Sequence, residues 1–228
     1  MIKSGNRRVT VVFAMLILLS ATAFFANILI GNVNIGLDEV VRILFAGGGD
    51  IKSRNIIASI RLPRTVMTFV LGGALAVSGF LLQTYFANPI AGPYILGISS
   101  GAKMAVAMSL IFITAGTGYT SNLMLVMTAF VGAMAATGFI ILISKRVRNM
   151  AALLAAGIMI GYICSAVTDF LVTFADDSDI VNLHSWSQGS FSGATMSAAW
   201  FSTCIVGVVF VAVMLMSKVL DAFRLGEV

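Results

Sequence analysis

An uncharged, apolar run extends from Thr65 to Leu82 and constrains the fold more than any other feature of the sequence. About 20 residues of this kind in a helix cross the hydrocarbon core of a bilayer. Further segments have the same character, so we predict an all-α, polytopic membrane helical bundle with about six transmembrane helices. The predicted spans cover about residues 9–30, 65–86, 94–113, 122–143, 151–174 and 192–216.

The composition indicates that lipid is the solvent for most of this surface. Hydrophobic residues make up 59% of the chain and charged residues only 10%, whereas soluble domains carry about 25% charged residues. The net charge of +5 therefore concerns membrane orientation, and we expect no nucleic-acid partner. Cys164, Cys204 and the single histidine, His184, do not have metal-ligand spacing, so we expect no metal site and no cofactor.

Basic residues predict that the N-terminus is cytoplasmic. In that orientation Lys and Arg gather before the first span, between the fourth and fifth, and after the sixth, as the positive-inside rule requires. The exception is the first outer segment, which contains Arg42, Lys52, Arg54, Arg61 and Arg64. Residues 36–46 of this segment repeat apolar side chains at helical spacing, which predicts an amphipathic helix at the membrane surface.

Prolines set the connection between the second and third predicted spans. Asn88, Pro89 and Pro93 interrupt the apolar sequence, and proline lacks the N–H that a helix interior needs. We therefore expect a hairpin whose two spans lie side by side. Lys103 and Asp169 each fall within a predicted span; either they lie near helix ends, or they face protein or water inside the bundle.

Arg61 and Arg64 flank a Leu-Pro pair directly before the second span. One interpretation is that they anchor the helix end at the headgroups. The other is that they form a docking site for an acidic partner outside the membrane, because guanidinium groups bind carboxylates in planar, bidentate pairs. The break in the positive-inside distribution favours docking.

Residues 97–101 (GISSG) match the GxSxG nucleophile pattern, and Asp169 and His184 follow in triad order. That pattern requires a strand–turn–helix within a sheet, whereas here it stands between a proline turn and a membrane span. We therefore disfavour an intramembrane hydrolase with Ser99 as nucleophile and expect no catalytic residue. The sequence also lacks GxxxxGK[ST], so any ATP hydrolysis belongs to another chain.

Five stretches, taken in order, resemble a known family. They are RLPR at 61–64, GGALAVSGFLLQ at 72–83, NPIAGPYILGISSGA at 88–102, LLAAG at 153–157 and WSQGSFSGA at 186–194. Together they resemble the permease subunits of ABC importers for iron–siderophores, haem and vitamin B12, the FecCD type. The RLPR-to-SSG block carries most of the likeness.

The resemblance implies a permease of the bacterial plasma (inner) membrane that imports its cargo by alternating access. An iron–siderophore complex is the first expectation for that cargo, followed by haem and vitamin B12. The implied partners are a second permease copy, two cytoplasmic ATPase subunits and an extracytoplasmic substrate-binding protein. Arg61 and Arg64 would face glutamates of that binding protein, which agrees with the docking interpretation.

The resemblance also assigns roles within the fifth span. One helical face would form the wall of the substrate pathway, through Gly157, Gly161, Ser165 and Thr168. Asn149, Met150 and Ala151, at the inner end, would form a cytoplasmic gate. Met150 departs from the small hydroxyl residues of relatives, so the resemblance does not carry the details of the gate.

Members of this family have about ten spans built as two related halves. This chain stops where the ATPase-coupling segment would begin, so we expect a single permease domain over residues 1–228 that is incomplete at its C-terminus and truncated after the sixth span. Sites of inverted-repeat transporters form between halves, and this polypeptide alone should not transport. The alternative is a non-transporting half-permease that scaffolds or regulates a complete one.

Overall fold

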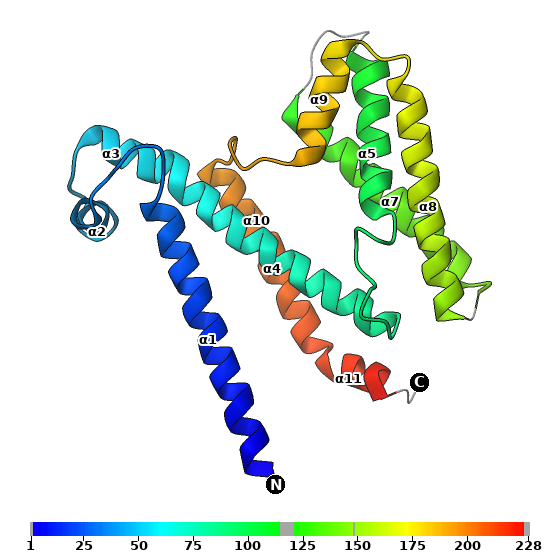
Figure 1. The fold of residues 1–228 in the computed structure, drawn as a ribbon, viewed down its shortest axis with the longest axis horizontal. Helices are drawn as coiled ribbons and strands as arrows, with labels where there is room; N and C mark the ends of the chain where they lie inside the picture. The colour runs from blue at the N-terminus through cyan, green and yellow to red at the C-terminus, as the bar shows by residue number, and fades with distance from the viewer. Residues whose placement is uncertain (1, 115–120, 148, 226–228) are drawn as a thin grey trace. The chain divides into compact units, whose positions relative to one another are not determined.

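The computed structural model describes residues 2–114, 121–147 and 149–225. Every regular element within these ranges is a helix, which confirms the predicted all-α class. The chain divides into two compact units, Met1–Ala74 with Phe191–Val211, and Leu75–Ser190 with Ala212–Val228. Figure 1 shows the helices in chain order. The single domain expected over 1–228 stays a prediction.

The first unit begins with two helices and a long composite helix. Its elements are α1 (Ile2–Leu29), α2 (Leu37–Ala46), α3 (Ile51–Ile56), the π-helical turn η1 (Ile57–Arg61) and α4 (Leu62–Tyr85). The second unit contains α5 (Ile98–Met108), the π-helical turn η2 (Ser109–Thr114), α7 (Asn122–Ser144), α8 (Met150–Val172), α9 (Asp177–Gln188) and α11 (Ser217–Leu225). Both α4 and α10 (Met196–Leu215) run across the boundary between the units.

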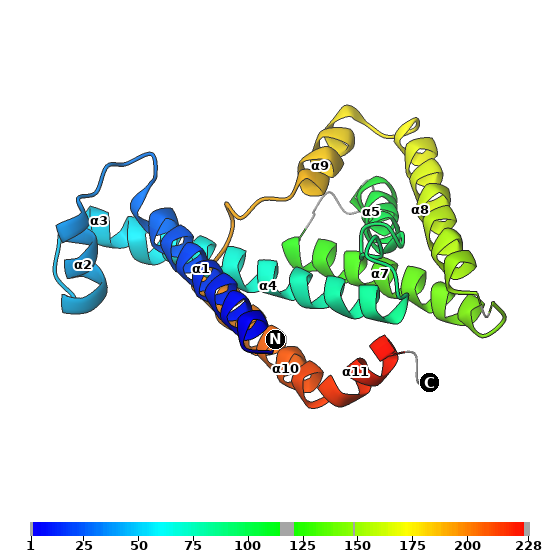
Figure 2. The same ribbon diagram turned by 60° about the horizontal axis from the view of Figure 1, so that its bottom comes forward.

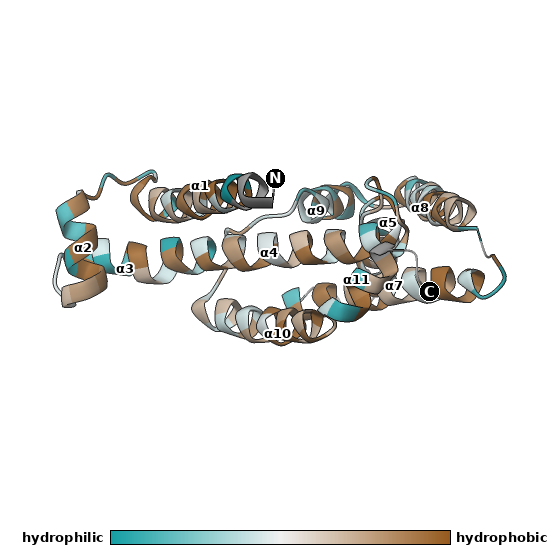
Figure 3. Cartoon of the chain, turned by 90° about the horizontal axis from the view of Figure 1, so that it is seen from below, coloured by the Kyte–Doolittle hydropathy of each residue, from teal (hydrophilic) through white to brown (hydrophobic). Residues whose placement is uncertain are grey.

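Five helical segments in the described part of the chain are long and apolar enough to cross a membrane. They are Arg7–Leu29, Ile51–Tyr85, Asn122–Ser144, Met150–Val172 and Met196–Leu215. In place of the predicted third span stands a shorter apolar helix, Ile98–Ile113, because turns occupy the chain up to Gly97. Figure 3 shows apolar residues along α4 and α10, with hydrophilic residues gathered on α2 and α11.

The segment Ile51–Tyr85 forms one helix with a wide turn in it. Pro63 has no N–H to bond with the carbonyl of Ser59, and η1 accommodates this by pairing the Leu62 N–H with the carbonyl of Ile57. A helix of 35 residues is about 52 Å long, whereas the hydrocarbon core is about 30 Å thick. One end of this helix must therefore project beyond the core.

Apolar contacts join the N-terminal part of this long helix to α1 and α2. Ile28 of α1, Ile35, Val40 of α2 and Ile57 of η1 form a buried cluster. Val40 and its apolar neighbours occupy one face of α2, where the sequence predicts an amphipathic segment over 36–46. Gly47 ends α2 with φ of 64°, a left-handed conformation that glycine adopts without strain.

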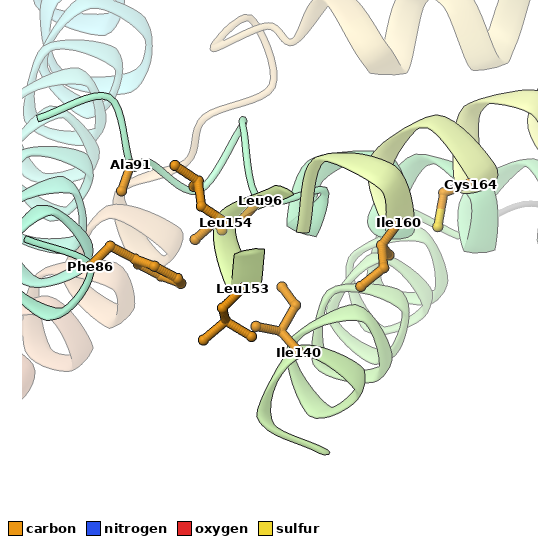
Figure 4. Packing of buried hydrophobic residues seen from close by; sticks show 8 residues of the cluster. All are labelled: Phe86, Ala91, Leu96, Ile140, Leu153, Leu154, Ile160 and Cys164. Carbon is orange, nitrogen blue, oxygen red and sulfur yellow. The ribbon is translucent and has the colours of Figure 1, made fainter. Parts of the chain in front are cut away.

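The second unit is built around α5, which packs against α7 and α8 (Figures 1 and 2). The expectation that the second and third spans lie side by side stays a prediction, because most of α4 belongs to the first unit and α5 to the second. Turns through residues 86–97 connect α4 to α5. Figure 4 shows the apolar cluster beneath these turns, which comprises Phe86, Ala91, Leu96, Ile140, Leu153, Leu154, Ile160 and Cys164.

Candidate functional site

Arg61 lies at the end of η1 and its side chain is only 7% exposed. One guanidinium nitrogen donates to the carbonyl oxygens of Ile28 and Leu29, at 2.9 and 2.8 Å, and the other donates to the carbonyl of Val33. The last carbonyls of a helix have no partner within the helix, and a cation placed there also complements the helix dipole. Arg61 therefore caps the C-terminal end of α1, a structural role that sequence reasoning missed.

The guanidinium group of Arg64 forms fewer hydrogen bonds than that of Arg61. Its Nη2 donates to the carbonyl oxygen of Ser192 at 3.0 Å, while its buried Nε has no hydrogen-bond partner among the described residues. The side chain is half-buried. Because a guanidinium has five N–H donors, Arg64 retains donors beyond its bond to Ser192 that could bind an incoming acceptor.

A cavity of about 360 Å³ lies beside these arginines within the first unit. Its lining combines the two guanidinium groups with amide side chains and a few apolar residues, namely Asn27, Ile30, Gly31, Asn32, Val33, Ile56, Ile60, Arg61 and Arg64. The lining carries no acidic side chain, so the cavity has a positive potential suited to a carboxylate. Thr65 supports it, with its hydroxyl 3.0 Å from Asn27 Oδ1 and 2.8 Å from the Arg61 carbonyl oxygen.

Asn27 and Asn32 were not singled out from the sequence. They join the site only because the end of α1 meets η1, and no spacing in the sequence signals a contact across about thirty residues. The capping bonds of Arg61 create that contact.

The proline-set turn has a defined local structure. Asn88 Oδ1 accepts from the backbone N–H of Ile90 at 2.9 Å, and the Asn88 carbonyl oxygen accepts from the N–H of Ala91 at 3.2 Å. Pro89 is exposed and Pro93 half-buried. The turn buries Ala91 in the apolar cluster of the second unit (Figure 4), so these residues act through packing.

Three of the four predicted pathway residues on α8 face the interior of the second unit. Gly157 and Gly161 lie against Leu96 and Gly97, where a Cβ built on Gly97 would come within 2.6 Å of the Gly161 backbone nitrogen. Gly97 also has φ of 74°, so no other residue fits without strain. Thr168 is 2% exposed, and its hydroxyl donates to the Cys164 carbonyl oxygen at 2.8 Å.

Ser165 lies apart from these three residues, on the exposed surface of α8. The shared helical face expected from the resemblance therefore packs mostly against the rest of the second unit, with its glycines at the turn of Leu96 and Gly97. The exposed side of α8, which holds Ser165 and Asp169, is the side that remains available to line a pathway.

The predicted gate residues form the start of α8. Asn149 is the N-cap, and its Oδ1 accepts from the backbone N–H groups of Ala151 and Ala152 at 2.9 and 3.4 Å. Met150 and Ala151 are exposed. The cap fixes where α8 begins, because it satisfies two of the N–H groups that a helix start leaves without partners.

The GxSxG match does not form a nucleophile elbow. Residues 86–97 are turns with no strand, and Ser99 lies in the first turn of α5. His184 is part of α9, where its ring is 3.3 Å from the amide nitrogen of Gln188. The geometry that GxSxG catalysis requires is not present around Ser99.

The FecCD transport family matches residues 16–228. The chain belongs to this family.

Two of the curated proteins similar to this chain are named vitamin B12 import system permease protein BtuC. The protein of Klebsiella pneumoniae subsp. pneumoniae is 34% identical over 177 residues, covering 78% of this chain and 52% of the relative. That of Escherichia coli O6:H1 is 32% identical over 169 residues, covering 74% and 51%. The chain thus spans about half the length of the curated relatives it matches.

A solved structure described as an inward-facing conformation of a metal-chelate type ABC transporter has a TM-score of 0.77 to this chain at 23% identity. It covers 96% of this chain, which covers 65% of that one. At this identity the likeness shows the fold alone. The FecCD family assignment predicted from RLPR and the following motifs is confirmed by the family match.

Proposed function

We propose that this chain is part of the permease of an ABC importer that takes up a metal-bearing chelate. Membership of the FecCD transport family supports this, as do relatives named for vitamin B12 import. An iron–siderophore complex and vitamin B12 are the cargoes to test first. The proposed partners are a second permease copy, cytoplasmic ATPase subunits that hydrolyse ATP, and an extracytoplasmic substrate-binding protein, in the bacterial inner membrane.

The arginine-lined cavity is the observation that supports docking of the binding protein. Arg64 lines it with a half-buried side chain that makes a hydrogen bond to Ser192, and a glutamate carboxylate could accept from its remaining guanidinium donors in a charge-assisted pair. Arg61 already donates to three carbonyls. We therefore propose different roles for the two predicted docking residues. Arg64 binds the partner, and Arg61 maintains the shape of the cavity.

This division gives a direct test by binding and stability measurements on the full permease. Arg64→Glu should weaken binding of the cognate substrate-binding protein by about tenfold to a hundredfold, since a like charge replaces the donor, and should leave thermal stability near that of the wild type. Arg61→Ala should instead lower stability by about 2–4 kcal/mol, because it leaves the carbonyls at the end of α1 without a partner.

Arg54→Glu is the matched control. It reverses an exposed charge on the same composite helix, outside the cavity lining, and should change affinity less than about threefold. Unchanged affinity in Arg64→Glu would refute docking at the cavity. Uptake of labelled vitamin B12 or ferric siderophore by cells that depend on this permease tests import itself.

A further inference from the structure

The larger apolar residues of α2 fall into two arcs around the helix. The first arc packs within the first unit and consists of Val40, Ile43 and Leu44. The second arc is exposed and consists of Leu37, Val41 and Phe45, which are 65%, 47% and 80% exposed. At about 100° per residue, this exposed arc spans about 80° and contains no other residue of α2. Protein therefore covers only part of the apolar face of α2.

Polar side chains dominate the remaining arc of α2, and its two acids have local contacts. Asp38 Oδ1 lies 2.6 Å from the position that a Cβ on Gly36 would take, at the start of the helix. Glu39 Oε1 accepts from the N–H of Asp50 at 3.4 Å. Arg42 is exposed and has no ion pair or hydrogen-bonded side-chain partner within the described ranges. Its guanidinium group is available to an acceptor outside the chain.

The position of α2 places these arcs at the end of the first span. Ile28, the last residue but one of α1, belongs to the same buried cluster as Val40. Figure 1 shows α2 along its own axis while α1 runs across the view, so the two axes cross. A span runs within a few tens of degrees of the bilayer normal. The axis of α2 therefore lies close to the plane of the membrane surface.

Lipid is the neighbour that suits the exposed arc. The arc extends only about 12 Å along the helix, whereas a standard protein interface buries about 800 Å² on each partner. Interfacial helices bury such an arc at the boundary between headgroups and acyl chains and keep a polar arc with Lys or Arg above it. Arg42 suits that boundary, because its apolar stem can lie along acyl chains while the guanidinium group pairs with a phosphate.

We propose that α2 is a lipid-binding anchor, with Leu37, Val41 and Phe45 inserted at the headgroup–acyl boundary and Arg42 bound to a lipid phosphate. The buried arc of α2 then fixes the depth of the end of α1 and of η1 in that leaflet. The sequence pattern over 36–46 does not distinguish the two apolar arcs, whereas the burial of Val40 does. The anchor depends neither on the cargo nor on docking at Arg64.

Nitroxide accessibility tests which environment meets the exposed arc. Phe45→Cys and Ala46→Cys each receive a nitroxide label, in a full permease with Cys204→Ala, reconstituted in phosphatidylethanolamine–phosphatidylglycerol vesicles. Ala46 is the matched control, since it is also exposed but lies about 100° around the helix from Phe45. The unlabelled-site parent, Cys204→Ala, measures any label on buried Cys164.

Oxygen concentrates in hydrocarbon, whereas a nickel chelate stays in water. The ratio of oxygen to nickel collision rates should therefore be at least about threefold higher at Phe45→Cys than at Ala46→Cys. Equal ratios would overturn the anchor, because the arc would then face water. Low collision rates with both reagents at Phe45→Cys would also overturn it, because a second copy or another protein would then cover the arc. Val41→Cys repeats the comparison should the label at Phe45→Cys disturb α2.

The phosphate contact is tested in the same measurement. Arg42→Glu should lower the collision ratio at Phe45→Cys by at least about twofold, because phosphates repel a carboxylate and the helix moves outward. Arg42→Lys should keep most of the ratio, since the positive charge remains. Arg54→Glu, an equally exposed charge reversal on α3, is the control and should leave the ratio unchanged. An unchanged ratio in Arg42→Glu would refute the phosphate contact.

Discussion

At the scale of single residues, a glycine contact determines how α5 meets α7. The carbonyl oxygen of Gly101 lies within clashing distance of the position that a Cβ on Gly132 would take, and the Cβ of Ala105 is 2.6 Å from the same position. The backbones can approach this closely only because Gly132 lacks a side chain, which is how small residues promote helix packing in membranes.

Gly132→Ala should therefore destabilise the second unit by about 1–3 kcal/mol through overpacking. Gly138→Ala on the same helix is the control, since nothing lies within 4 Å of a Cβ built there, and it should be neutral or slightly stabilising because alanine favours helix. Thermal unfolding in detergent measures both. Equal effects of the two substitutions would show that the contact with Gly101 does not matter.

At the scale of elements, the helix Ile51–Tyr85 depends on a proline for its shape. Pro63 forces the π-helical turn η1, and η1 carries Arg61 to the end of α1. Replacing a proline inside a helix ordinarily gains stability, but here the wide turn has a packing role.

Pro63→Ala should lower stability, by about 1–3 kcal/mol, despite its better helix propensity. Regular α-helical bonding through residues 57–61 would rotate the segment before η1 by about 100° relative to α4, which would disrupt the contact between η1 and the end of α1 that Arg61 bonds to. Combining Pro63→Ala with Arg61→Ala checks the cause, since the double variant should be little worse than Arg61→Ala alone. Additive losses would contradict a shared mechanism.

Much of this element list could be predicted from the sequence, because uncharged runs of spanning length leave few folds open. The exceptions are instructive. The segment after Asp176 lies between two predicted spans and has no predicted element, yet it forms α9, where Asp177 and Asp179 occupy the first turn and complement the helix dipole. Gly157 and Gly161 predict close packing of α8, but their spacing does not reveal that the partner is the loop at Leu96 and Gly97.

The residues of the candidate site could be predicted in part, but their contacts could not, because sequence spacing does not reveal contact partners. Arg61 and Arg64 stand out by charge and by their RLPR pattern. The number of hydrogen bonds that each guanidinium group forms, however, depends on where α1 ends in space. Asp169 also stands out, and only the burial of Thr168 and Gly157 shows which side of α8 it shares with Ser165.

At the scale of the whole molecule, the placement of basic residues predicts the topology. Lys145 and Arg146 follow α7, on the side predicted to be cytoplasmic, while Asp177 begins α9 on the opposite side. Arg146→Cys should therefore be protected from a membrane-impermeant thiol reagent added to intact spheroplasts, and Asp177→Cys should be labelled. Both variants carry Cys164→Ala and Cys204→Ala. The reverse labelling pattern would invert the orientation.

The reach of Arg61 back to Ile28, 33 residues earlier, also has a consequence for biogenesis. While the nascent chain emerges, the end of α1 leaves the ribosome 33 residues ahead of Arg61 and can enter the bilayer before Arg61 is available. Its last carbonyls must bond to water or headgroups until then, since they have no partner within the helix. Insertion and anchoring of the first span are thus separate events in time. A chain stalled before Arg61 has emerged from the ribosome would hold a first span without its C-terminal cap.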